Sequence, residues 1–547
     1  MSATVSSPSD VLNQPPPIPD YNSYAAHPAL REAVQREGAG WAEDRLLALG
    51  EVAGRADVRE LGRLANENPP ILRTFDRYGH RIDEVEFHPA WHELLEHAMR
   101  HGIHALPWAE PQPGAHVART AMFQTWNIEA GHGCPISMTY SAVPALRTDP
   151  DIAAEWEPKM EVYAYDRRFI PAPEKASVLF GMAMTEKQGG SDVRANITRA
   201  TPIGGGEYEL TGHKWFCSAP MCDAFLVLAQ AEGGLTCFLM PRFRPDGSLN
   251  AFHIQRLKDK LGNRSNASSE VEFRGAWAQR LGEEGRGVPT IIEMVGHTRL
   301  DCVGGAAAGM RVAVEQATWH TAHRSAFGRL LADQPLMRNV LADLALESEA
   351  ATATALRLAR AYDASADDEG EALFKRLGTA VAKYWTCKRA TTHAAEALEC
   401  FGGNGFVEES GMPRLYREAP LNGIWEGSGN VISLDVLRAL VKTPATLEAF
   451  FAEVDLAAGA DARLDRYVAK TREELGREPE TLEVRARRVV ERMALSLQGS
   501  LLVRHAPPAI ADAFCASRLD GDWGRAFGTL PAGTDFEAII DRHALAV

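Results

Sequence analysis

Two neighbouring segments carry residues suited to holding a large cofactor. The first is the turn Met184-Thr-Glu-Lys-Gln-Gly-Gly-Ser-Asp192, whose glycines and hydroxyls expose many hydrogen-bonding groups. The second, Gly212-His-Lys-Trp-Phe-Cys-Ser218, has the pattern of a strand with an aromatic surface and a hydroxyl, which suits a planar heteroaromatic ring. Alone, Gly-Gly-Ser-Asp is a common tight turn. Together the two segments predict a ring-bearing, hydrogen-bonding cofactor, so we expect an enzyme.

A mostly helical α+β fold of several domains should position these segments. The chain has 547 residues, too many for a single core, and its 45% hydrophobic and 24% charged residues are typical of a globular protein. We expect a helical domain over 1–180, which starts with a flexible Ser- and Pro-rich arm that ends near Asn22. A β domain over 181–285 should follow it. A helical bundle over 286–440 and an additional helical domain over 441–547 should follow.

Local patterns predict individual elements. Runs of β-forming residues between turn signals predict strands over 208–216, 224–230, 235–243 and 270–273. Long Pro-free runs rich in Ala, Leu and Arg predict helices over 337–362 and 372–398. From residue 28 to about residue 175 the pattern is helical throughout.

Composition argues against several classes of protein. Neither a membrane-spanning run nor a signal peptide is recognisable, so we expect a cytoplasmic protein that does not enter a membrane. The eight cysteines lack metal-ligand spacing, and we therefore assign neither disulfides nor a metal. A net charge of −15 argues against a surface that binds nucleic acid everywhere, although a local basic patch could still do so.

The order of motifs resembles the acyl-CoA dehydrogenase family. The glycine turn and the Trp-Phe-x-Ser strand are followed by Arg324-Ser-Ala-Phe-Gly328 with Gln334, then Cys400-Phe-Gly-Gly-Asn-Gly-Phe406, then Ile424-Trp-Glu-Gly-Ser428. Five motifs in one order over about residues 90 to 440 make a chance match improbable. The resemblance implies an N-terminal helical domain, a central β barrel or sandwich, a C-terminal helical bundle and an FAD cofactor.

Finer details resemble the AidB-type branch of that family, which is linked to the adaptive response to DNA alkylation. They are the Lys-Gln pair in the glycine turn, the start Asn66-x-Asn-Pro-Pro70, the stretch Arg256-Leu-Lys-Asp-Lys-Leu-Gly-Asn-Arg-Ser-Asn-Ala-Ser268 and the long C-terminal addition. This resemblance runs nearly from end to end.

The resemblance implies an FAD site built by two subunits. From one subunit, the FAD-binding residues would be Met182, Thr185, Gly190, Ser191, Phe216, Ser218, Ser428 and Asn430, with Phe216 near the flavin ring and Ser218 near its N5. From a neighbouring subunit, Arg324, Phe327, Gln334, Gly402 and Gly403 would reach the adenosine and pyrophosphate, since Arg pairs with phosphate and glycine permits close approach. A homo-oligomer, a tetramer by resemblance, is therefore expected.

By the same resemblance Glu426 is the catalytic base. Dehydrogenation needs a base to remove the α proton of an acyl-CoA while hydride leaves the β carbon for flavin N5. In isolation, Glu before Gly-Ser is more often a solvated turn residue. Trp425 stands where the dehydrogenases usually have Tyr, and its bulk predicts a short or branched acyl chain, or weak turnover. Arg299 could lie near Glu426, guide an acyl-CoA or form a surface ion pair, and Arg264 could serve CoA or brace the β domain.

The C-terminal addition offers a possible contact with double-stranded DNA. Arg485, Arg488 and Arg492 share one face of a helix and could bind successive phosphates, although a solvated face interleaved with acidic residues has the same pattern. The main alternative to a dehydrogenase is therefore a DNA-binding protective flavoprotein with little or no turnover. A third hypothesis, oxidation of a nitroalkane, also needs a carboxylate base, but usually Asp.

Overall fold

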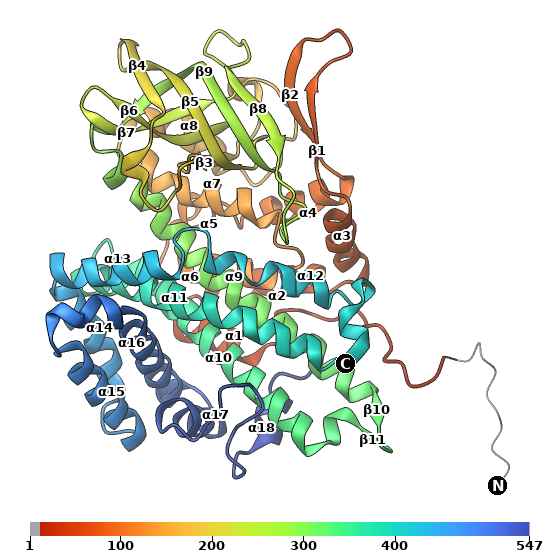
Figure 1. Cartoon of the computed structure of the whole chain (residues 1–547). Coiled ribbons are helices and arrows are strands. Elements are labelled where there is room, and N and C mark those ends of the chain that lie inside the picture. Colours follow the sequence, from red (N-terminus) through yellow and green to blue (C-terminus); the bar gives the residue numbers. More distant parts are fainter. Residues whose placement is uncertain (1–10, 546–547) are drawn as a thin grey trace.

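The computed structural model describes residues 11–545, and the first ten residues of the expected arm lie outside this range. Helices fill most of the region before the sheet, as expected (Figure 1). Their bounds are α1 (Pro28–Arg36), α2 (Glu43–Ala53), α3 (Ala56–Glu67), α4 (Pro89–Arg100), α5 (Leu106–Ala109), α6 (Ala115–Thr125), α7 (Gly133–Leu146) and α8 (Pro150–Met160). Residues 11–22 form neither helix nor strand, which agrees with the expected arm.

A β hairpin interrupts this helical region, contrary to the sequence expectation. Strands β1 (Ile71–Phe75) and β2 (Arg81–Glu86) pair antiparallel. Asp76 closes their turn by accepting hydrogen bonds from the backbone N–H groups of Tyr78 and His80, at 2.8 and 2.9 Å. Alternating side chains around a turn of this chemistry were the signal that the helical interpretation missed.

The central sheet closes into a barrel-like unit above the helices (Figure 1). Its order is β3-β6-β4-β5-β9-β7, β7 also pairs with β6, and β8 pairs with β9. All four predicted strands are confirmed, whereas β3, β4 and β8 were not predicted. The bounds are β3 (Phe180–Ala183), β4 (Arg199–Gly204), β5 (Glu207–Ser218), β6 (Ala224–Ala231), β7 (Gly234–Pro241), β8 (Phe252–Leu257) and β9 (Ser268–Leu281).

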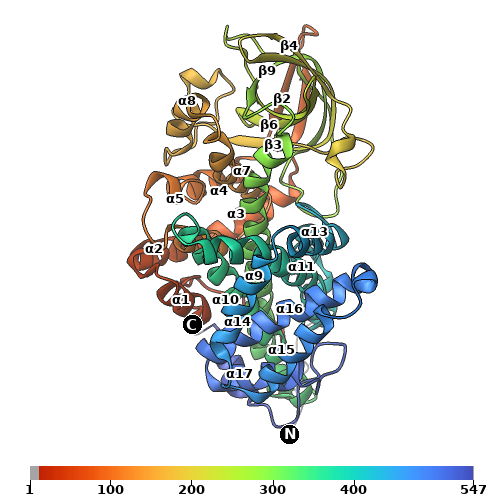
Figure 2. The ribbon, with the colours of Figure 1, turned by 90° about the vertical axis from the view of Figure 1, so that its left-hand side faces the viewer.

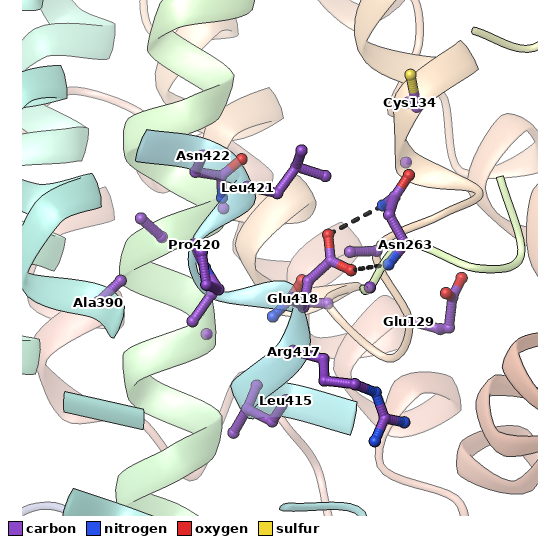
Figure 3. Close-up of a pocket in the computed structure, with 18 of the residues that line it drawn as sticks. Glu129, Cys134, Asn263, Ala390, Leu415, Arg417, Glu418, Pro420, Leu421 and Asn422 are labelled. Carbon is purple, nitrogen blue, oxygen red and sulfur yellow. Dashed lines mark hydrogen bonds between the residues drawn. The ribbon is translucent and has the colours of Figure 1, made fainter. Parts of the chain in front are cut away.

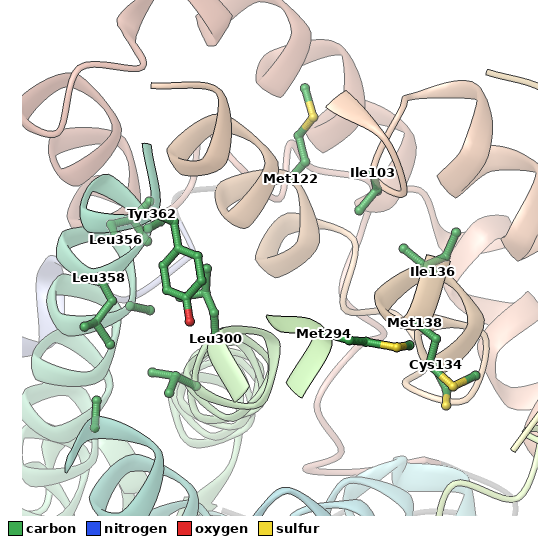
Figure 4. Packing of buried hydrophobic residues seen from close by; sticks show 14 of the residues in the cluster. Ile103, Met122, Cys134, Ile136, Met138, Met294, Leu300, Leu356, Leu358 and Tyr362 are labelled. Carbon is green, nitrogen blue, oxygen red and sulfur yellow. The ribbon is translucent and has the colours of Figure 1, made fainter. Parts of the chain in front are cut away.

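A bundle of long helices lies below the barrel. It contains α9 (Gly287–His323), α10 (Pro335–Ala364), α11 (Glu369–Glu399), α12 (Met412–Glu418) and α13 (Gly429–Lys442). The two predicted helices correspond to α10 and α11. Figure 4 shows buried side chains of α6, α7, α9 and α10 packing together, among them Met122, Met294, Leu300 and Tyr362. The bundle and the N-terminal helices therefore share one hydrophobic core.

The C-terminal addition is helical, as expected, and packs against this bundle (Figure 2). Glu453 accepts hydrogen bonds from Arg504 at 2.5 Å and from Arg357 of α10 at 2.7 Å, so an ion-pair network joins the two parts. The helices of the C-terminal addition are α14 (Ala445–Val454), α15 (Ala462–Leu475), α16 (Leu482–His505), α17 (Pro508–Phe514) and α18 (Phe536–Asp541). Between residues 11 and 545 no helix has the length and apolar character needed to span a bilayer.

Candidate active site

A cavity of about 2070 Å³ lies where the barrel, α7, α9 and the loop before α13 meet. Eight of the predicted site residues line it, six from the barrel side and two from the loop. They are Met182, Thr185, Gly190, Ser191, Phe216, Ser218, Glu426 and Ser428. Folding thus brings together segments that lie more than 200 residues apart in the sequence.

The glycine turn is held against β5. The backbone N–H of Trp215 donates to the carbonyl of Thr185 at 2.8 Å. A Cβ atom on Gly190 would lie 2.3 Å from Thr185 Oγ1, so a larger residue there would displace the hydroxyl. Glycine at this position therefore lets the backbone of the turn approach the hydroxyl that faces the cavity.

A fully buried ion pair between Lys214 and Glu186 holds the glycine turn in place. Lys214 Nζ donates to Glu186 Oε1 at 2.9 Å, and both side chains are inaccessible to solvent. Glu186 also accepts from the backbone N–H groups of Ile197 at 2.7 Å and Thr198 at 3.1 Å. Burial raises the pKa of Glu186, but the Lys214 ammonium and these donors outweigh it and hold the pKa at about 2. Both residues belong to the two predicted cofactor segments, but the sequence gives no sign that their side chains pair.

Phe216 presents an aromatic face to the cavity. The residue is 51% exposed, so part of its ring is accessible to a ligand. Lys258 Nζ lies 4.4 Å from its ring centroid and 3.8 Å from that of Trp215. These cation–π contacts restrict the ring orientation while one face stays open to a planar ligand.

Glu426 adopts a left-handed backbone conformation with φ of 57°, which costs a residue of this type about 1–3 kcal/mol. Surrounding contacts impose this conformation. Arg299 Nε donates to the Glu426 carbonyl at 3.0 Å, and Lys383 Nζ donates to the carbonyls of Trp425, at 2.8 Å, and Gly427. The loop therefore holds the carboxylate in one place, facing the cavity.

The environment of Glu426 tunes its acidity. Burial raises the pKa of its carboxyl above the ordinary value. A hydrogen bond from Thr298 Oγ1 to Glu426 Oε2, 2.8 Å long, and the positive charges of Arg299 and Lys383 act in the opposite direction. A carboxyl with a raised pKa in a cavity has the properties of a general base.

The two loop residues after Glu426 differ in their placement. Ser428 precedes α13, but its side chain makes no capping bond to the helix, so its hydroxyl can serve a ligand in the cavity. Asn430 is exposed and lies outside the cavity lining.

Trp425 forms part of the cavity wall. Its indole Nε1 donates to Asn422 Oδ1 at 2.9 Å, and the ring packs against a cluster that includes Cys302 and Ala306 of α9 and Ala390 of α11. The expectation of a short or branched acyl chain rested on crowding by this ring. The indole is held in this wall by these contacts, and the expectation about the acyl chain stays a prediction.

The second set of predicted cofactor residues lies at the far end of α9. Arg324 is 26 residues beyond Thr298, about 39 Å away at the α-helical rise of about 1.5 Å per residue. Phe327 is 99% exposed and has φ of 54°, and Arg324, Gln334, Gly402 and Gly403 all lie outside the cavity lining. The cavity lining nevertheless reaches His320, Phe401 and Asn404, so this second set lies beside the far end of the cavity without lining it.

The three arginines of α16 do not form one exposed row. Arg485 donates to the Glu474 carbonyl at 2.6 Å and to its carboxylate at 3.1 Å. The Arg492 guanidinium lies 4.5 Å from the centre of the Tyr467 ring, with two of its nitrogens buried. The Arg488 side chain is 64% exposed. Of the three, only Arg488 is therefore largely exposed, and its guanidinium still lies 3.8 Å from the Glu474 carboxylate.

A second carboxyl with a raised pKa lines the cavity and was not predicted (Figure 3). Glu418 at the end of α12 accepts hydrogen bonds from the backbone N–H of Asn263 at 2.6 Å and from its side-chain amide at 2.9 Å. Burial, with the nearby Glu129 carboxylate, raises the pKa of Glu418 to about 7. Arg264, on the same loop as Asn263, also lines the cavity and donates weakly to the Lys260 carbonyl at 3.4 Å. The loop that carries both residues thus docks onto α12.

Three family models match consecutive stretches of the chain between residues 13 and 441. Residues 13–167 match the family described as adaptive response protein AidB N-terminal domain. Residues 181–276 match the acyl-CoA dehydrogenase middle domain, and residues 285–441 match the acyl-CoA dehydrogenase C-terminal domain.

Curated relatives and solved structures agree with these matches. The chain is 48% identical to the Escherichia coli (strain K12) AidB protein over 516 residues, covering 93% of this chain and 94% of the relative. It is 33% identical to acyl-CoA dehydrogenase family member 11 of Caenorhabditis elegans, covering 76% of this chain and 70% of the relative. The solved structure of Caenorhabditis elegans ACDH-11 in complex with C11-CoA has a TM-score of 0.85 at 26% identity, covering 99% of this chain and 93% of that one. The Bd2924 apo-form has a TM-score of 0.83 at 28% identity, covering 90% of this chain and 99% of that one.

Proposed function

The chain belongs to the AidB-type branch of the acyl-CoA dehydrogenase family, a family of FAD-dependent oxidoreductases, and we propose that it dehydrogenates an acyl-CoA thioester. In this proposal Glu426 is the catalytic base. The single observation that carries the proposal is the placement of its carboxylate. Glu426 faces the cavity, has a strained backbone conformation and accepts a hydrogen bond on one carboxylate oxygen. Its carboxyl also has a raised pKa.

In this proposal Glu426 removes the proton from the carbon α to the thioester carbonyl. Thr298 keeps the carboxylate oriented, and Arg299 and Lys383 keep the loop from swinging towards solvent. FAD, when bound, supplies the acceptor for the hydride that leaves the β carbon. Burial of the carboxylate strengthens it as a base, because the charged form has lost solvation.

The cavity residues fit such a cofactor. Hydrogen bonds to the cofactor could come from the turn at Gly190 and from the Ser428 hydroxyl, which caps no helix. The exposed ring of Phe216 offers an aromatic surface in the same cavity. Met182, Thr185, Ser191 and Ser218, which also line the cavity, would complete this half of the site. Asn430, in the first turn of α13, lies outside the lining, and its FAD contact rests on the resemblance alone.

A second copy of the chain would supply the other half. Arg324, Phe327, Gln334, Gly402 and Gly403 lie outside the cavity lining of their own subunit, and the full exposure of Phe327 supports a contact outside the monomer. A homotetramer, in which pairs of subunits exchange these residues, agrees with that geometry.

The mouth of the cavity suits the phosphates of CoA. Arg299, Arg376 and Arg438 all lie within ion-pairing distance of the single carboxylate of Asp435. This cluster carries more positive than negative charge, and three of its members line the cavity. An excess of guanidinium groups of this kind favours a phosphate-bearing ligand.

Anaerobic titration of the FAD-loaded protein with acyl-CoA thioesters tests this function. Flavin absorbance should be bleached, and Glu426→Gln should abolish the bleaching while FAD content is retained. Conversely, bleaching that survives in the Glu426→Gln variant would remove Glu426 from the reaction.

A DNA-associated protective role linked to alkylation is the second proposal. The match to the adaptive response protein AidB N-terminal domain and the exposed charge of Arg488 support it. A mobility shift of duplex DNA that weakens steeply with salt, and that Arg488→Glu reduces, is the expected result. A shift that is unchanged by that substitution would place any DNA contact elsewhere.

A further inference from the structure

The cavity extends well beyond Glu426 along one face of α9. Its lining includes Thr298, Cys302, Gly305, Gly309 and Val312, whose spacing of three or four residues keeps them on a single face of the helix. Gly309 lies 11 residues beyond Thr298, which is about 16 Å along the helix axis. A short acyl group would leave this part of the cavity unfilled.

Gly305 and Gly309 leave space along this face of α9 because they carry no side chain. A Cβ atom on Gly305 would lie 3.4 Å from the amide nitrogen of Asn422 and 3.7 Å from the ring of Phe123, so any larger side chain would narrow the channel between them. At Gly309 a Cβ atom would meet nothing within 4 Å, so the space beside this residue is open. Ala390 and Ala394 of α11 also line the cavity with small apolar groups.

The N-terminal arm lies at the far end of the cavity. Pro15, Pro16 and Pro17 are part of the lining, and the carbonyl of Pro16 accepts a hydrogen bond from Trp319 Nε1 at 2.8 Å. Gln14 Oε1 accepts another from Asn404 at 3.1 Å. The arm is thus tied to both α9 and the loop after α11.

We propose that this extension binds the distal part of a long, straight acyl chain, which passes Gly305 and runs along the open space beside Gly309. The inference rests on the proposed function, since it names the class of acyl-CoA that this site accepts. The distance of about 16 Å is roughly half the 30 Å hydrocarbon thickness of a bilayer, the length of one lipid tail. The small apolar residues Cys302, Gly305, Gly309 and Val312 follow one another along this stretch, and such a lining fits a hydrocarbon chain better than a polar group.

Calorimetric binding to the FAD-loaded, full-length protein tests the inference with butanoyl-, octanoyl- and dodecanoyl-CoA. Each buried methylene is worth about fourfold in affinity. We expect dodecanoyl-CoA to bind at least a hundredfold more tightly than butanoyl-CoA. Dissociation constants that do not change with chain length would overturn the inference.

Gly309→Phe should fill the extension and reduce the ratio of dodecanoyl- to butanoyl-CoA affinity at least tenfold. Phe has a higher helix propensity than Gly, so the helix should form, and Gly309→Leu is a smaller second variant. Gly296→Ala, on the same helix but outside the cavity lining, should keep the wild-type ratio. An unchanged ratio in both Gly309 variants, or a change in oligomeric state as their only effect, would refute the channel.

Binding heat and flavin bleaching separate the two proposals. Chain-length-dependent binding without bleaching would support the channel and refute dehydrogenation. Bleaching by all three thioesters, bound with equal affinity, would support dehydrogenation and refute the channel.

Discussion

Replacing Thr298 with Val removes the hydroxyl that donates to Glu426 Oε2 at 2.8 Å and leaves a side chain of nearly the same shape. That bond stabilises the ionised carboxylate, so its loss should raise the pKa of Glu426 further. A hydrogen bond to a charged group contributes about 1.5–3 kcal/mol, which corresponds to an upward shift of about 1–2 pH units.

The pH dependence of flavin reduction under anaerobic conditions measures this shift. Glu426 accepts a proton only when ionised, so the rate should fall as the pH drops through its pKa. In Thr298→Val the midpoint of this acid limb should move up by about 1–2 pH units, while the rate at high pH changes little. Thr298→Ser keeps a hydroxyl and should retain the wild-type midpoint.

A midpoint that stays in place or moves to lower pH in Thr298→Val would refute the reasoning. It would mean either that the limb reports another group or that the hydroxyl does not stabilise the charged form of Glu426.

Three further predictions concern stability and assembly. Lys214→Met should lower the free energy of unfolding by about 3–5 kcal/mol in urea titrations, because Glu186 would keep a buried charge without its cation; a loss below 1 kcal/mol would contradict this. Glu418, with a pKa raised to about 7, favours folding in its protonated form, so stability should decline by up to about 3 kcal/mol from pH 5 to pH 8. Glu418→Gln should flatten that decline in the same titrations, and an equal slope in both proteins would exclude this carboxyl. Arg324→Ala should reduce bound FAD per chain, measured by absorbance, and unchanged FAD content would argue against a shared site.

The sequence determined much of the fold through local patterns. Runs of β-forming residues placed four strands of the barrel, and Pro-free periodic segments placed α10 and α11 within a few residues. The hairpin over 71–86 and strands β3, β4 and β8 escaped prediction, because short strands gain their stability from partners that are distant in the sequence.

The candidate site divides in the same way. Residue types and motif order sufficed to single out Glu426, Phe216 and the glycine turn, because their chemistry is written in the side chains. Only the tertiary structure decided that Thr298 donates to Glu426 and that Glu418 is a second titrating carboxyl. A pKa depends on burial and on charges that folding brings near, and neither is visible in a linear chain. The same holds for cavity length, which is set by how helices pack rather than by any single residue.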